Sequence, residues 1–379
     1  MKAAPTILIA AGGTGGHMVP AHALSEALQE RGFAVELASD ERGLRFPGLF
    51  DGVPTHIMET RPPRFGAGVG ALKFAIALRK AEALVRQAVH RSKPAAIVGF
   101  GGYPTYPAGR VAISSKVPLI LHEQNAVLGR VNRRLAGRAS AIALSLPNTL
   151  KLPRAAKAKA HVIGNPVRNE IAVLNQQGYP VYDADQVLRL LVIGGSQGAR
   201  ILSEVVPNAL RMLPPGLKHR LHVTQQCRED DIKSVREVYT KEKIPAELST
   251  YIQDMAHELA STHLVISRAG ASSVAEIASA GRPSILIPFA AATDDHQTAN
   301  ARALKQADAA VVIAESDFSA TSLAKAIQKL GNDPKRLTNA AQAARLTARP
   351  NAAAALADLV QTVAAKSLGE FTSAGKAAE

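Results

Sequence analysis

The apolar positions of this chain follow two alternating spacings. Short apolar runs ended by glycine or a polar turn predict buried strands, and stretches with an apolar residue at every third or fourth position predict helices. Ile7 to Ala10 form the first such run, and Leu24 and Leu28 follow at helical spacing. Further strands are expected in FAVELAS, AAIVGFGG, PLILHEQN and AIALS, and a helix over about 71–91. This alternation predicts a parallel sheet with crossover helices.

The alternation pauses near HVIGNPVRNEI and begins again at LRLLVIGGSQGAR. The second half repeats the scheme, with strands expected in HRLHVTQQ, HLVISRAG and PSILIPFA. We therefore predict an α/β fold of two Rossmann-like domains whose parallel sheets face a central cleft. The expected divisions are a first domain at 1–168, a linker at 169–186, a second domain at 187–350, and a helix with a tail at 351–379, the helix packing back on the first domain.

Length and cysteine content narrow the class of protein. A chain of 379 residues is long enough for two hydrophobic cores. The single cysteine, Cys227, excludes an internal disulfide framework and favours a reducing compartment, the cytoplasm. The first apolar stretch is too short for a secretory signal, and no run approaches the roughly 18 apolar residues of a membrane span.

The net charge of +14 is concentrated in one segment. From Arg61 to Arg168 there are 19 Lys and Arg residues against Glu82 and Glu123, whereas the remainder holds 26 basic and 29 acidic residues. Such a basic segment predicts an anionic partner, which is a nucleic acid, an acidic membrane surface or a phosphorylated substrate. The scarcity of aromatic residues there disfavours single-stranded nucleic acid.

Three glycine loops follow expected strands, at Gly12–Gly16, Gly99–Gly102 and Gly194–Gly198. Glycines let backbone N–H groups approach a ligand closely, and the start of a following helix favours a phosphate. One such loop could be a tight turn, whereas three of them suggest backbone that approaches a ligand. None of them reads G-x-G-x-x-G, but Asp40 follows the second strand, where a dinucleotide-binding acid lies in nicotinamide-dependent enzymes. A hydride-transfer function therefore stays open beside a phosphate-binding one.

Polar residues follow two of the expected strands. The run His122–Asn125 comes directly after the strand ending at Leu121, and polar side chains at such a carboxyl end face a ligand in this architecture. Gln297, in DDHQTANA, offers a donor and an acceptor suited to sugar hydroxyls. Either group is alternatively a solvated loop. No His and Cys residues stand at metal-ligand spacing, and the pair Asp294–Asp295 alone does not make a nucleotide–metal site, so no metal or cofactor is expected.

Two readings are open for SRAGASSVAEIASAGRP. Ser273 stands three residues before Glu276 at an expected helix start, which is the spacing of a capping box. The alternative is that Glu276 accepts hydrogen bonds from the two hydroxyls of a ribose whose phosphates lie on a nearby glycine loop.

The helix over 71–91 carries a second feature on its polar side. Leu72 and Ile76 fall among basic residues rather than on the face expected to pack on the sheet, which holds Phe74, Leu78, Ala81, Val85 and Ala88. Exposed apolar residues ringed by Arg79, Lys80 and neighbouring bases suit an anionic membrane interface. Isolated surface Leu and Ile residues are also normal, so an ordinary solvated face is the alternative.

Six motifs occur in order from about residue 7 to residue 301, namely GGTGGH, GFGGYPTYP, HEQNAVLG, GNPVR, GGSQGAR and SRAGASSVAEIASAGRP…DDHQTANA. Together they resemble the MurG family. The resemblance implies a membrane-associated, metal-independent, inverting glycosyltransferase of the GT-B fold. It implies transfer of N-acetylglucosamine from UDP-N-acetylglucosamine to the MurNAc of undecaprenyl-pyrophosphoryl-MurNAc-pentapeptide, lipid I, to give lipid II for peptidoglycan. The implied setting is the cytoplasmic face of the bacterial inner membrane, with an anionic membrane surface and other cell-wall synthesis proteins as partners and no nucleic acid.

The resemblance also implies roles for single residues. By position, the residues that contact the donor are Thr14, Gly15, Gly16 and Asn125, and those on its phosphate side are Arg168 and Ser196. Ile252 lies on the uracil side, Glu276 at the ribose and Gln297 at the sugar. Ser272 and Ser273 replace a Leu–Thr type pair of the family. The first glycine loop is then expected to hold the acceptor diphosphate. Thr105 stands where the family often has serine, and TQQC replaces a His-Gln-x-Gly pattern.

The implied reaction requires a base for the acceptor hydroxyl. His17 is the first candidate because its ordinary pKa near ~6.5 suits neutral pH, and Glu123 is the second. The alternative for His17 is a structural role in the loop or a contact to phosphate. Three other functions remain: another GT-B UDP-sugar transferase with a lipid or small-molecule acceptor, a nicotinamide-dependent oxidoreductase, and a nucleic-acid or anionic-lipid binding protein.

Overall fold

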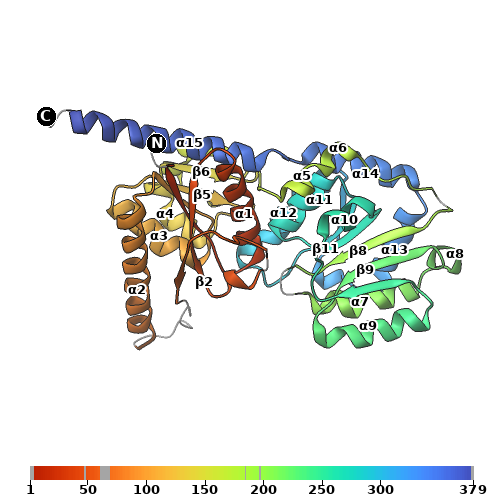
Figure 1. The fold of residues 1–379 in the computed structure, drawn as a ribbon. Helices are drawn as coiled ribbons and strands as arrows, with labels where there is room; N and C mark the ends of the chain where they lie inside the picture. The colour runs from red at the N-terminus through yellow and green to blue at the C-terminus, as the bar shows by residue number, and fades with distance from the viewer. Residues whose placement is uncertain (1–3, 47, 60–68, 184, 196–197, 377–379) are drawn as a thin grey trace. The chain divides into compact units, whose positions relative to one another are not determined.

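A computed structural model gives the structure of the chain and describes residues 4–46, 48–59, 69–183, 185–195 and 198–376. The chain forms two compact units, one of residues 1–168 with 351–379 and one of residues 169–350. Each unit is a parallel sheet covered by helices (Figure 1). The α/β fold class and the two parallel sheets are therefore confirmed.

The first unit holds a seven-stranded sheet of order β3-β2-β1-β4-β5-β6-β7. Its strands are β1 (Thr6–Ala10), β2 (Ala34–Asp40), β3 (Thr55–Met58), β4 (Ala96–Gly99), β5 (Leu119–Glu123), β6 (Ala141–Leu144) and β7 (Ala160–Val162). Its helices are α1 (Gly15–Gln29), α2 (Val69–Ser92), α3 (Gly102–Ser114), α4 (Arg130–Leu135) and α15 (Ala352–Lys376), with short 3-10 turns η1 (Gly43–Arg45), η2 (Ala136–Arg138) and η3 (Arg154–Lys159).

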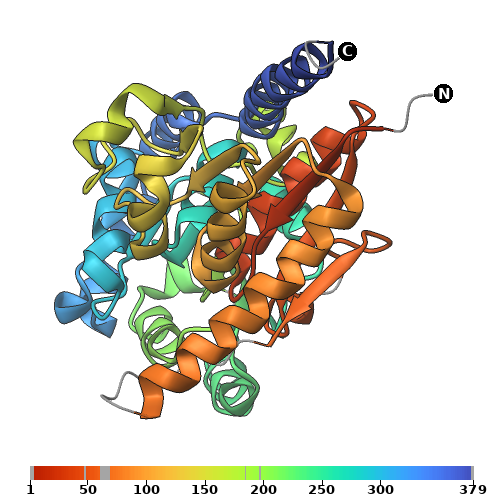
Figure 2. The same ribbon diagram turned by 90° about the vertical axis from the view of Figure 1, so that its left-hand side faces the viewer.

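Successive residues of β1 face opposite sides of this sheet, and each side has its own core. Ile7 and Ile9 pack in the layer that holds α1 and the apolar side of α15, whereas Leu8 and Ala10 pack in the layer that holds α2 and α3. This two-sided burial explains why the strand is an unbroken apolar run. Figure 2 shows α2 and α3 along the sheet.

The C-terminal helix α15 packs against α1 in the first unit. Leu356 and Val360 are fully buried in the same core layer as Leu24 of α1. An ion pair of 2.9 Å between the Arg31 guanidinium and the Asp358 carboxylate joins the turn after α1 to α15 at the surface. The last segment of the chain thus returns to the unit in which the chain began.

The second unit holds a six-stranded sheet of order β10-β9-β8-β11-β12-β13. Its strands are β8 (Leu188–Ile193), β9 (Leu221–Gln226), β10 (Ala246–Ser249), β11 (Leu264–Arg268), β12 (Ser284–Ile287) and β13 (Ala310–Val312). Its helices are α5 (Asn169–Ala172), α6 (Leu174–Gln177), α7 (Arg200–Arg211), α8 (Pro215–Lys218), α9 (Glu229–Lys241), α10 (Met255–Ser261), α11 (Ala271–Ala280), α12 (His296–Gln306), α13 (Ala320–Gly331) and α14 (Pro334–Thr347), with 3-10 turns η4 (Thr293–Asp295) and η5 (Glu315–Asp317).

Residues 169–186, which the sequence suggests as a linker, carry α5 and α6. Ile171 and Leu174 are buried in the core of the second unit, and the Tyr182 hydroxyl donates a hydrogen bond to the Gly331 carbonyl. A few widely spaced apolar side chains therefore attach this polar stretch to the second unit. Among the described residues, no helix combines the length and apolarity needed to cross a bilayer.

Candidate active site

The first glycine loop is held in shape by a buried acid. Asp40, at the end of β2, is fully buried, and its Oδ1 accepts hydrogen bonds from the backbone N–H groups of Gly13 at 2.9 Å and Gly43 at 3.0 Å. Its Oδ2 pairs with the Arg42 guanidinium at 2.7 Å. Gly12 is required here, since a Cβ would lie 2.7 Å from the Pro104 side chain. This carboxylate therefore shapes the loop, which is a different task from the ribose contact of a dinucleotide-binding acid.

The loop leads into the N-terminus of α1. Thr14 is the N-cap residue in an extended conformation, and its side chain caps no backbone N–H of the first turn. Gly15 is buried and Gly16 is half-buried at the start of the helix. The helix dipole places partial positive charge at this point, which favours an anion.

His17 lies in the first turn of α1 with its ring beside the second glycine loop. Its Nδ1 is 3.0 Å from the Gly12 carbonyl oxygen. Because a carbonyl only accepts, Nδ1 carries the proton and Nε2 keeps a lone pair. A Cβ on Gly102 would lie 3.2 Å from Nδ1, so this glycine makes room for the ring, and the positive φ of Gly101 and Gly102 favours glycine at both positions.

The charge state of His17 follows from these surroundings. Burial lowers the pKa of the imidazole, and this effect outweighs the hydrogen bond to Gly12 and the nearby carboxylates of Glu123 and Asp40, which raise it. His17 is therefore a neutral imidazole at pH 7 with an available basic nitrogen. This is the protonation state that a general base requires.

Glu123, at the end of β5, is only 2% exposed and accepts four hydrogen bonds. Its Oε1 accepts from the backbone N–H of Asn125 at 3.1 Å and from the Asn125 side-chain amide at 3.2 Å. Its Oε2 accepts from the Gly129 N–H at 2.8 Å and from the Asn132 side-chain amide at 2.9 Å. The carboxylate thus fixes the loop that carries Asn125.

The HEQN and GNPVR motifs meet at the carboxyl edge of this sheet. The His122 Nε2 is 3.1 Å from the Gly164 carbonyl, so Nε2 carries the proton, and burial lowers the pKa of the ring to about 4. Gln124 donates to the Phe100 carbonyl at 2.8 Å and so connects the same edge to the second glycine loop. Polar groups from β4, β5 and β7 therefore lie together, as parallel strands dictate.

Several buried polar atoms at this edge have no hydrogen-bond partner among the described residues. They are both side-chain atoms of Asn165, the His122 Nδ1 and the Asn132 Oδ1. Buried polar groups are normally satisfied, so unpaired ones at the edge of a parallel sheet mark a place for a polar ligand or water. Asn132 and Asn165 were absent from the residues singled out in the sequence. Asn165 lies within the GNPVR motif, which was the available signal.

In the second unit, the third glycine loop follows β8 and precedes α7. Ser196, a sequence candidate, lies outside the described residues. Gly194 is required by packing, since a Cβ would lie 2.5 Å from the Ala199 nitrogen. Gly198 has a φ of +66°, and a Cβ on it would lie 2.8 Å from the Arg228 side chain. Arg228 thus lies against this loop, although the sequence did not single it out.

The helix that carries Glu276 begins earlier than expected. Its N-cap is Gly270, its first residue is Ala271, and the Val274 N–H donates to the Gly270 carbonyl at 2.9 Å. The capping box of Ser273 and Glu276 is therefore wrong, because Gly270 and the small Ala271 already start the helix. Glu276 lies in the second turn and is 9% exposed, and Ser272 and Ser273 are half-buried in the first turn.

Side-chain hydrogen bonds hold the loop after β12. The Gln297 Oε1 accepts a hydrogen bond from the Phe289 N–H at 3.0 Å. The Glu315 carboxylate pairs with Arg268 at 3.0 Å and accepts from the Ala290 N–H at 2.8 Å. Although burial opposes ionisation of Glu315, these hydrogen bonds hold its pKa below the ordinary value. The sequence did not indicate Arg268 or Glu315, which are 47 residues apart.

The remaining candidates lie as follows. Arg168 is half-buried and is the last residue before the second unit. Ile252 is 8% exposed and packs in the core layer of the second unit that holds Leu259. Among the described residues no group of three or more His, Cys, Asp or Glu side chains is arranged to hold a metal ion.

Two family models match the chain. Residues 7–144 match the glycosyltransferase family 28 N-terminal domain, and residues 189–361 match the glycosyltransferase family 28 C-terminal domain. A relative from Novosphingobium aromaticivorans is 48% identical over 94% of this chain and 92% of its own length. One from Zymomonas mobilis is 49% identical over 96% of this chain and 94% of its own length. Both are named UDP-N-acetylglucosamine–N-acetylmuramyl-(pentapeptide) pyrophosphoryl-undecaprenol N-acetylglucosamine transferase.

Solved structures agree with this relationship. The crystal structure of Acinetobacter baumannii MurG matches with a TM-score of 0.75 at 29% identity, over 94% of this chain and 99% of that one. A Staphylococcus aureus MnaA–UDP structure matches with a TM-score of 0.66 at 14% identity, over 92% and 94%, and shares the fold. From the extent and level of its similarity to these named transferases, the chain belongs to the MurG family of glycosyltransferases.

Proposed function

We propose that this chain transfers N-acetylglucosamine from UDP-N-acetylglucosamine to the MurNAc 4-hydroxyl of lipid I, forming lipid II for peptidoglycan synthesis. The relatives named for this reaction support the choice of substrates. The structural observation that carries the chemistry is His17, a neutral imidazole whose Nε2 is available beside a glycine loop at a helix N-terminus.

In the proposed reaction the acceptor hydroxyl gives its proton to the His17 Nε2 as its oxygen attacks the anomeric carbon. The new C–O bond forms on the face opposite UDP, and the bond to the UDP phosphate oxygen breaks with its electron pair leaving on UDP. The configuration at the anomeric carbon therefore inverts. Glu123 acts as a positioning residue, because both of its oxygens already accept hydrogen bonds from the loop before α4 and from Asn132 of α4.

The charges of both diphosphates are met by the chain's own groups in this proposal. The loop Gly12–Gly16 and the start of α1 receive the acceptor diphosphate. The negative charge that develops on UDP is stabilised by the third glycine loop, the N-terminus of α11 and Arg168, without a divalent metal. Oriented N–H groups and a guanidinium suit a leaving diphosphate because their positions are set before the reaction.

The donor contacts follow the sequence candidates. Glu276 accepts hydrogen bonds from the ribose hydroxyls, Gln297 binds the sugar, and Ile252 lies on the uracil side. Thr14 and Asn125 complete the sugar contacts, while Ser196, Ser272 and Ser273 contact the phosphates. The near burial of Glu276 favours a hydrogen bond to ribose, since water competes weakly there.

We also propose that the protein acts at the cytoplasmic face of the inner membrane, docked by α2. Leu72 is 64% exposed and Ile76 is 48% exposed one turn away, with Lys73, Arg79, Lys80 and Arg86 exposed on the same helix. Apolar side chains at the headgroup boundary and bases near anionic lipid act together, each base contributing about 1 kcal/mol.

The docking surface is tested with anionic vesicles. Leu72→Ser with Ile76→Ser, or Arg79→Glu with Lys80→Glu, is expected to weaken vesicle binding and slow transfer to a membrane-embedded acceptor. Transfer to a soluble short-chain acceptor is expected to stay unchanged. Leu44→Ser with Ile57→Ser is the matched control, because these side chains are 49% and 47% exposed elsewhere in the same unit. Unchanged vesicle binding in both test variants would contradict docking by α2 and would mean that its exposed side is an ordinary solvated face.

The reaction itself is tested with labelled UDP-N-acetylglucosamine and a short-chain lipid I analogue. We expect a labelled disaccharide on the lipid that depends on both substrates. Release of free N-acetylglucosamine alone, or saturable turnover of a nicotinamide cofactor, would contradict the proposal.

A further inference from the structure

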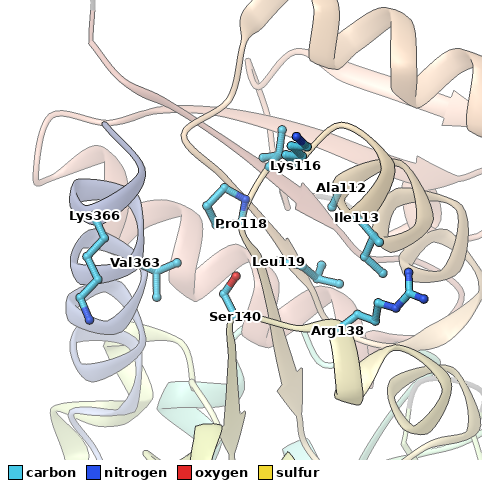
Figure 3. Close-up of a pocket in the computed structure, with 10 residues that line it drawn as sticks. Ala112, Ile113, Lys116, Pro118, Leu119, Arg138, Ser140, Val363 and Lys366 are labelled. Atoms are coloured by element: carbon cyan, nitrogen blue, oxygen red, sulfur yellow. The ribbon is translucent and has the colours of Figure 1, made fainter. Parts of the chain in front are cut away.

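A pocket of about 440 Å³ lies in the first unit, away from the carboxyl ends of its strands (Figure 3). It is bordered by the end of α3, by Leu119 at the start of β5, by Ser140 just before β6, and by α15. Leu119 and Ser140 mark the amino ends of their strands, whereas His17 and Glu123 lie at the opposite edge of the same sheet. A ligand in this pocket would therefore lie at the opposite edge of the sheet from His17 and Glu123.

Three cationic side chains line this pocket: Lys116, Arg138 and Lys366. All three are exposed, and none lies in an ion pair or side-chain hydrogen bond within the described part of the chain. The neighbouring Lys159 differs, because its Nζ donates to the Ala139 carbonyl at 2.9 Å. No Asp or Glu belongs to the lining. Three like charges around one hollow repel one another, and an anion between them removes that repulsion.

The other walls of the pocket are apolar. Ile113, Val117 and Leu119 line it together with Val363 of α15, and Figure 3 shows Ile113 and Val363 on opposite sides of Leu119. The Ser140 side chain also lines the pocket, near Val363 and Pro118 in Figure 3, and its hydroxyl offers one hydrogen-bond donor. The site thus pairs a cationic rim with a hydrocarbon wall, and its volume is within the usual range for small-molecule sites.

We propose that this pocket binds a phosphate ester that carries an apolar chain. The phosphate lies among Lys116, Arg138 and Lys366 and accepts from the Ser140 hydroxyl, and the chain lies against Val117 and Val363. Two sources have this chemistry, a phospholipid of the bilayer and a soluble phosphorylated amphiphile. The site is separate from the α2 docking surface and from the transferase reaction.

The test is calorimetric titration of the full chain, without donor or acceptor, with dihexanoyl phosphatidic acid below its micelle concentration. Saturable binding is expected, at least tenfold tighter than binding of inorganic phosphate or dihexanoyl phosphatidylcholine. Neutralising the three cations to Gln, or Ser140→Glu alone, is expected to weaken it at least tenfold. The control variant neutralises Arg45, Arg91 and Arg154, three exposed bases of the same unit, and is expected to leave it unchanged.

Flotation with phosphatidic acid vesicles identifies the source, in a Leu72→Ser, Ile76→Ser background that removes the α2 contribution. Loss of the residual vesicle binding in the Lys116, Arg138, Lys366 variant indicates a bilayer lipid. Binding of the monomeric amphiphile with no vesicle effect indicates a soluble ligand. Absence of saturable binding, equal affinity for inorganic phosphate, or equal losses in the control variant would overturn the proposal. The Tm of each variant reports its folding independently of activity, so failure of the transferase proposal remains distinguishable.

Discussion

Glu123→Gln separates a positioning carboxylate from a reacting one. The carboxylate accepts two hydrogen bonds at each oxygen, whereas the glutamine amide has one oxygen and one NH₂ group. The NH₂ group therefore faces two donors, and two hydrogen bonds to a charged acceptor are lost. Each lost hydrogen bond to a charged group costs about 1.5–3 kcal/mol. Because the two bonds belong to one network and are not additive, we use the lower value for each, which gives a total cost of about 3 kcal/mol.

The assay is amide hydrogen exchange. Because the remaining oxygen can face only one pair of donors, at least one of the Asn125 and Gly129 amides loses its acceptor. A local cost of about 3 kcal/mol corresponds to roughly a 100-fold loss of protection. Glu82→Gln, which removes the ion pair with Arg110 in the same unit, is the matched control and is expected to leave both amides protected.

The kinetic readout completes this prediction. A positioning role predicts that turnover falls together with the loss of protection while the pH dependence set by His17 persists. Unchanged protection of both amides, with loss of turnover and of the acid limb of the pH profile, would refute the reasoning and make Glu123 the base.

Three further predictions follow from the same geometry. Because burial lowers the pKa of His17, kcat/KM is expected to rise with pH, with a midpoint below pH 6.5, and to reach a plateau at higher pH; a midpoint at or above 6.5 contradicts this role. His17→Gln is expected to lower kcat by about 10²–10⁴-fold. Glu276→Gln is expected to weaken UDP binding by about 1–3 kcal/mol in calorimetry with no change in Tm, because Gly270 is the cap; a fall in Tm with UDP affinity intact contradicts it. Turnover is expected to be unchanged in excess chelator, and a loss that magnesium restores would show that a divalent metal takes part.

The central strands of the first sheet and helix α2 could be predicted because their hydrophobic patterns are distinct. β1, β4, β5 and β6 are buried on both faces and so read as apolar runs, and the helix expected at 71–91 is α2. The edge strands β3, β7, β10 and β13 were not predicted. They have three or four residues, and most of these are partly exposed, so neither the apolar run nor the alternation is distinct.

The candidate site could be located in part from the sequence. HEQN follows an expected strand and could therefore be placed at the carboxyl edge of the first sheet. GNPVR follows β7, which was not predicted, so its place beside HEQN comes from the structure. The contacts that join them could not be predicted, because His122 and Gly164 are 42 residues apart and their bond depends on the register of β5, β6 and β7. The Arg268–Glu315 pair depends on tertiary structure in the same way.

The start of α11 shows a different limit. Ser273 with Glu276 matches a capping box by spacing, but Gly270 and Ala271 also permit a helix start, and sequence alone does not choose between them. The structure places the cap three residues earlier and leaves Glu276 in the second turn, so the cap no longer explains this acid.

The central claim, inverting transfer to lipid I, is tested most directly by proton NMR of the product formed from UDP-N-acetylglucosamine and a soluble lipid I analogue. We predict a disaccharide on the acceptor whose new anomeric proton has the large coupling constant of a β linkage, opposite to the α linkage of the donor. A retained α linkage, or a donor converted to its 2-epimer with no product on the acceptor, would contradict the account.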